Sequence, residues 1–92
     1  MSNRIITHNI SQNRFETHVG EEVAHIDYIR KNNVMALVHT FVPHAHRNNG
    51  IGFALVRFAL EYAKHEQLKI IPGCSSVQLF MERHPAYDEL IA

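Results

Sequence analysis

The stretch VMALVHTFVP, residues 34–43, decides how this chain folds. Residues 34–42 are nearly all apolar and rich in β-branched or aromatic side chains, a pattern typical of a central strand covered on both faces. Pro43 ends the strand, because proline has no amide hydrogen for the ladder. From Gly50 to Glu66 the polar side chains fall on one narrow helical stripe, which predicts a mostly buried helix after a short loop.

Shorter elements flank this junction. Residues 14–19 and 22–30 alternate in character, and the second run places Ala24, Ile26 and Tyr28 on one face of a strand. The segment Lys31-Asn32-Asn33 predicts a hairpin turn, because asparagine tolerates a positive φ angle. Downstream, residues 69–71 predict a short strand. Ser75 or Ser76 then caps a second, shorter helix that runs to about Arg83.

Strands first, then a long helix with only one strand and a shorter helix after it, predict the α+β class with a mixed, mostly antiparallel sheet. The 92 residues, 1–92, suffice for one small domain, and 46% hydrophobic residues predict a folded core. Nine basic and nine acidic residues cancel, so charge gives no argument for binding to nucleic acid or to an acidic membrane.

Cellular location is predicted from what the sequence contains. The single cysteine, Cys74, fits a reducing compartment. Neither a signal-peptide pattern at the start nor an apolar run of about 18 residues is present. We therefore expect a cytoplasmic protein, as a monomer or homodimer, without a membrane or nucleic-acid partner.

The strongest local signal is the turn Arg47-Asn48-Asn49-Gly50-Ile51-Gly52 at the start of the long helix. Amides in the first turn of a helix have no intrahelical acceptor, and the helix dipole adds partial positive charge. Gly50 and Gly52 let a pyrophosphate approach the backbone, and Arg47 can add a charged fork. On the glycines alone, a plain loop before a buried helix is the favoured explanation of the turn.

Three stretches together resemble the GNAT superfamily of acyl-CoA N-acyltransferases, and in particular its abbreviated YjdJ-like subgroup. They are HTFVP at residues 39–43, the Arg-x-x-Gly-x-Gly pattern at residues 47–52, and IIPGCS at residues 70–75, followed by Phe80 and Pro85-Ala86-Tyr87. The chain departs from the pattern at Asn48-Asn49, where a basic residue and glycine are usual. It departs again at Ala86, where the subgroup often has glutamate.

The resemblance implies a single GNAT-like domain with splayed central strands, one long helix and one shorter helix. It implies acetyl-CoA as cosubstrate, with pantetheine aligned by the backbone of Phe41 and Val42. The pyrophosphate would lie on Arg47 and the amides of Asn48, Asn49, Gly50, Ile51 and Gly52. The reaction expected is transfer of acetyl to a primary amine.

Catalysis is expected to involve Cys74 and a histidine. A cysteine near a helix N-terminus has a lowered pKa, although a small buried thiol is the commoner fate. The resemblance places Cys74 near the thioester, where it could carry the acetyl group, act as an acid or only line the site. His39 is the first candidate for the base that deprotonates the amine, and His44 and His46 are alternatives.

Two rival functions remain open. The first is a non-catalytic acyl-CoA-binding or sensor module, because a chain this short leaves little room for an acceptor pocket. The second is zinc binding by His39, His44 and His46, which the spacing supports only weakly, so no metal is expected.

Overall fold

The computed structural model of the protein describes residues 4–92. Residues 1–3, which belong to the expected domain and to the start searched for a signal peptide, lie outside the described residues. The elements, in chain order, are β1 (Thr7–Asn9), η1 (Ile10–Gln12), β2 (Arg14–Val19), β3 (Glu22–Lys31), β4 (Val34–Phe41), η2 (His44–His46), α1 (Ile51–His65), β5 (Lys69–Pro72), α2 (Ser75–Arg83) and η3 (Pro85–Leu90).

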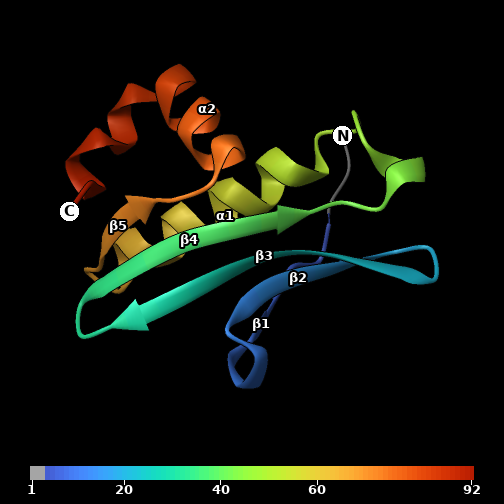
Figure 1. The fold of residues 1–92 in the computed structure, drawn as a ribbon, viewed down its shortest axis with the longest axis horizontal. Coiled ribbons are helices and arrows are strands. Elements are labelled where there is room, and N and C mark those ends of the chain that lie inside the picture. Colours follow the sequence, from blue (N-terminus) through green and yellow to red (C-terminus); the bar gives the residue numbers. More distant parts are fainter. Residues whose placement is uncertain (1–3) are drawn as a thin grey trace.

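The five strands form one sheet in the order β1-β2-β3-β4-β5 (Figure 1). The first three pairings are antiparallel and the last, β4 with β5, is parallel, which confirms the mixed, mostly antiparallel sheet. Asn32 at the β3–β4 turn has φ of 57°, as expected for the hairpin. The β5 strand lies at the edge, where Ile70 forms an isolated bridge with Ile91.

Helix α1 packs across one face of the sheet, which we call the inner face (Figure 1). The predicted face of β3, with Ala24, Ile26 and Tyr28, is buried beneath it. Helix α2 and η3 pack on α1, so they lie on this same side of the sheet. The opposite, outer face is exposed at Ile29, which is 63% accessible. Of the helices in residues 4–92, none has the length and apolar character to cross a bilayer.

One prediction about β4 is wrong: this strand is not covered on both faces. Its first half alternates, with Met35 and Leu37 fully buried on the inner face. Leu37 then pairs with Tyr28 and His39 pairs with Asp27, so Val38 is an extra residue in a β-bulge. A bulge shifts the alternation by one residue. After the bulge, Thr40 lies on the inner face, while His39 and Phe41 lie on the outer face.

A polar contact lies inside the aromatic part of the core. The ring of His8 is within 4.4 Å of the Phe15 ring and 4.8 Å of the Tyr62 ring, centroid to centroid. Its Nε2 atom is 2.6 Å from the Tyr28 hydroxyl oxygen. Burial, and then the positive charge of Arg30, lower the pKa of His8, because both disfavour the imidazolium form. The aromatic packing therefore favours the neutral ring.

Candidate functional site

The site begins where β4 and β5 separate. Their pairing runs from Val34 with Lys69 to Leu37 with Pro72, and the Gly73 amide then donates to the Leu37 carbonyl at 2.9 Å. This is the last backbone bond between the two strands within residues 4–92. A side chain at Gly73 would meet that carbonyl oxygen at 3.0 Å, so glycine permits the close approach.

The separation divides β4 into two halves. The closed half, residues 34–37, has a strand on each side. The open half, residues 38–41 with Val42 following, pairs with β3 alone. On its other edge, the backbone groups of the open half are not paired with a strand in the described part of the chain. This separation of β4 from β5 is the splay that the resemblance implies. Because β5 is an edge strand, however, the splay is not between two central strands.

The turn before α1 has the predicted geometry. Gly50 is the N-cap with φ of 78°, and Asn48 has φ of 70°, so both take left-handed angles. No side chain caps the helix, and the first intrahelical bond joins the Ala54 amide to the Gly50 carbonyl at 3.0 Å. The amides of residues 51–53 therefore have no intrahelical acceptor. Free amides at a helix N-terminus can donate to an anion, and these lie beside the open half of β4, since a Cβ at Gly52 would meet Val42 and Thr40.

A groove of about 660 Å³ joins the turn to the open half. All predicted cofactor-binding residues except Asn49 line it. Two basic or aromatic side chains that the sequence did not single out for the site also do so, namely Arg83 from α2 and Phe53 from α1. The full lining consists of His39, Thr40, Phe41, Val42, His46, Arg47, Asn48, Gly50, Ile51, Gly52, Phe53, Ser76 and Arg83.

Arg47 reaches back to the strand instead of pointing only at the turn. Its Nε atom donates to the Val42 carbonyl at 3.0 Å. A ligand that pairs with the backbone of the open half would have to displace this bond or use the remaining groups. The guanidinium of Arg83, whose carbon lies 5.8 Å from the centre of the Phe53 ring, adds a second positive charge to the groove.

Cys74 lies at the inner side of the fork. It is the N-cap of α2, which corrects the prediction that a serine caps this helix. Its Sγ atom is 3.5 Å from the Thr40 hydroxyl oxygen across the fork. Burial acts to raise the pKa of the thiol, but hydrogen bonds from Thr40 and from the amides of Ser76 and Val77 outweigh it, and the pKa is lowered. The lowered pKa is the direction expected for a thiol near a helix N-terminus.

The predicted base, His39, lies on the outer face and is exposed, although its position in an apolar run suggested the core. His44 is exposed in η2, while His46 lines the groove. No group of three or more histidine, cysteine or acidic side chains that could hold a metal ion occurs in the part of the chain that the structure describes. The zinc alternative gains no support from this.

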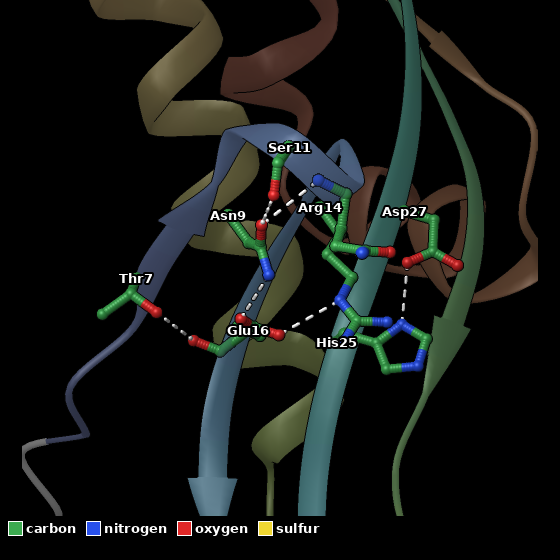
Figure 2. Close-up of polar contacts among 8 residues, drawn as sticks. Thr7, Asn9, Ser11, Arg14, Glu16, His25 and Asp27 are labelled. Carbon is green, nitrogen blue, oxygen red and sulfur yellow. Dashed lines mark hydrogen bonds and ion pairs between the residues drawn. The ribbon is translucent and has the colours of Figure 1, made fainter.

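The polar pair His25 and Asp27, which lies on the outer face near His39, was not identified from the sequence. His25 Nδ1 is 2.7 Å from Asp27 Oδ1, and the ring centroid of His25 lies 5.4 Å from that of Phe41 and 6.1 Å from that of His39 (Figure 2 shows the His25–Asp27 contact). A usable signal existed, since residues two apart in a strand share a face.

Comparison with known proteins decides the family. A family model described as GCN5-related N-acetyl-transferase matches residues 14–90. The chain belongs to the GCN5-related N-acetyltransferase family. A solution NMR structure of a GCN5-like proposed N-acetyltransferase from Staphylococcus aureus is similar at 29% identity and a TM-score of 0.73, over 100% of this chain and 91% of that one.

Membership confirms the α+β GNAT-like fold and supports acyl transfer as the general activity. Acetyltransferases of this GNAT family use acetyl-CoA as cosubstrate, and the groove of this chain has donors that suit it. Assignment to the YjdJ-like subgroup stays a prediction, as do the roles of Cys74 and His39.

Proposed function

We propose that this protein transfers the acetyl group of acetyl-CoA to a primary amine. The observation that carries the proposal is the continuity of the groove, from the uncapped amides of α1 to the open half of β4. Acetyl-CoA has a diphosphate for the first, and pantetheine amides that can pair with a strand edge for the second. The cosubstrate supplies the activated acyl group as a thioester.

Different residues of the groove bind different parts of acetyl-CoA. The amides of residues 51–53 donate hydrogen bonds to the diphosphate, and the guanidinium groups of Arg47 and Arg83 add positive charge. The open half of β4 orients the pantetheine arm. The left-handed angles at Asn48 and Gly50 hold the turn in this shape before any ligand arrives, which reduces the entropy that binding must cost.

The transfer requires a neutral amine and a protonated leaving thiol. An ammonium acceptor first loses one proton to a base, then its nitrogen forms the C–N bond while the C–S bond breaks. The leaving thiolate takes a second proton from the attacking nitrogen. The thiol of Cys74 lies 3.5 Å from the hydroxyl of Thr40, which lines the groove, and in this proposal Cys74 relays that proton by way of Thr40.

A thermal-shift titration tests binding first. Acetyl-CoA at millimolar concentration should raise the melting temperature by several degrees, because a ligand of the folded state stabilises it by mass action. The matched control is Gly52→Leu, which places bulk between α1 and the open half. No shift for the wild-type protein would refute a CoA site.

Thiol release over a panel of primary amines then separates an enzyme from an acyl-CoA-binding module. The binding module is the second candidate because no helix in residues 4–92 covers the outer face to build a closed acceptor pocket. Binding without thiol release would favour it. Mass spectrometry after incubation with acetyl-CoA, compared with Cys74→Ser, shows whether Cys74 carries the acetyl group.

A further inference from the structure

Five polar side chains and Phe41 form a ladder of cross-strand pairs on the outer face of β2, β3 and β4. In one row Arg14 pairs with Asp27, and Asp27 pairs with His39. In the adjacent row Glu16 pairs with His25, and His25 pairs with Phe41. His39 and Phe41 also line the groove, so the ladder runs from the middle of the sheet to the proposed acetyl-CoA site.

The β2 end of the ladder is already neutralised. Arg14 Nε lies 3.1 Å from Glu16 Oε2, and the Asn9 side-chain amide donates to Glu16 Oε1 at 2.8 Å (Figure 2). The bond from Asn9 lowers the pKa of Glu16 most, with Arg14 adding to it against the effect of burial. Glu16 is therefore held as a carboxylate by groups on its own side of the sheet, and its charge is compensated.

The centre of the ladder is arranged differently. Asp27 Oδ1 lies 2.7 Å from His25 Nδ1, so the carboxylate can accept a hydrogen bond from that ring nitrogen. A carboxylate on Nδ1 fixes the ring orientation and leaves Nε2 as the proton-accepting nitrogen. The side chains are 17% and 32% accessible, so both are reachable from the outer face. Imidazole oriented by a carboxylate is the usual construction of a general base.

We propose that His25, oriented by Asp27, is the base that takes the proton from a primary ammonium acceptor docked on the outer face beside Phe41. This inference rests on the proposed function and names the substrate side of the same site. The open half of β4 then separates two proton-handling groups, with His25 on the outer face and Cys74 on the inner face beside Thr40. The proton taken by His25 Nε2 passes to water once the C–N bond has formed.

The test measures acetylation of putrescine, spermidine and Nα-acetyl-lysine amide against pH in four variants. His25→Gln should lose about 10²-fold or more in rate and lose the acid limb of the profile, the range typical of a removed base. Asp27→Asn should keep the acid limb and lower the rate less than His25→Gln does, because the imidazole remains while its orientation by the carboxylate is lost. His39→Gln should keep an acid limb whatever its effect on the rate, and the exposed His65→Gln should keep the wild-type rate and profile.

Two measurements keep the result interpretable. Acetyl-CoA thermal shifts should equal that of the wild type in His25→Gln, Asp27→Asn and His65→Gln, since these three residues are not in the groove lining. In NMR spectra of the protein, adding spermidine should move the ring signals of His25 more than those of His65. A wild-type profile in His25→Gln, or loss of the limb in His39→Gln alone, overturns this inference while leaving acetyl-CoA binding intact. Absence of any acetyl-CoA shift in the wild type refutes the underlying function and this inference with it.

Discussion

The two halves of β4 differ although they belong to one strand. The closed half is bonded on both edges and carries the fully buried Met35 and Leu37. The open half is bonded on one edge, and its residues Val38 and Phe41 are 39% and 37% exposed. The first half holds the core together and the second forms a wall of the groove. A single bulge residue and the turn of β5 at Gly73 make that change of role.

Matched truncations in the two halves should give the largest difference. Leu37→Ala removes a fully buried side chain and should cost about 2–5 kcal/mol of unfolding free energy. Phe41→Ala removes a partly exposed ring and should cost less than about 1.5 kcal/mol. Denaturant unfolding of both variants measures this difference. Equal losses of unfolding free energy would mean that the open half contributes as much to the core as the closed half does.

Bulk placed against the open half should affect binding and leave stability nearly unchanged. A Cβ at Gly52 would meet Val42 and Thr40 at 3.7 and 3.9 Å, which is ordinary contact. Gly52→Ala should therefore be tolerated and gain up to about 1 kcal/mol from helix propensity. Gly52→Leu should weaken acetyl-CoA binding about tenfold, or about 1.4 kcal/mol. Calorimetric titration checks this, and wild-type affinity in Gly52→Leu would move the site elsewhere.

The reactivity of Cys74 tests the contact across the fork. Thr40→Val removes the hydroxyl hydrogen bond, so the pKa of the thiol should rise and its alkylation profile should move to higher pH. At neutral pH the rate with iodoacetamide should fall roughly a few-fold, as expected for one hydrogen bond. The reading is unambiguous because the chain has one cysteine. Thr7→Val, on the far strand, is the control and should leave the rate unchanged.

Acid should lower the free energy of unfolding slightly, because His8 becomes protonated. The pKa of His8 is lowered in the folded state, so the stability that its neutral ring supports is present above the unfolded pKa of about 6.5. That stability is lost as pH falls through the lower folded value. Tyr28, which His8 contacts, pairs with Leu37 of the closed half between strands β3 and β4. Unfolding of His8→Leu should depend less on pH between 6.5 and 5, and an unchanged dependence would exclude His8.

Much of the fold was predictable because it follows from local pattern. The alternation of Ala24, Ile26 and Tyr28 and the asparagine turn are set by neighbouring residues alone, and both are as expected. The bulge at Val38 was not predicted, since no glycine or proline marks it and pairing with β3 creates it. Without the bulge His39 would share the inner face with Met35 and Leu37, because one extra residue exchanges the two faces of a strand.

In the candidate site, too, the local features were predictable from the sequence and the features made by tertiary packing were not. The turn from Arg47 to Gly52 was predicted from its glycines and from the resemblance, because its geometry is local. Arg83 and Thr40 were missed because only tertiary packing brings α2 and the inner face of β4 to the groove. His25 and Asp27 could have been found, since their spacing places them on one face, but nothing in the sequence says which strand lies beside them.

The fork at Gly73 has a consequence for how the groove behaves over time. Its position is set by one amide, which donates to the Leu37 carbonyl at the boundary between the two halves. If that bond opens, separation of the strands can advance toward Ile70, and if it persists the groove keeps its depth. Hydrogen exchange at the Gly73 amide therefore reports the opening of the groove directly, and its rate relative to the Ile70 amide measures how far the opening travels.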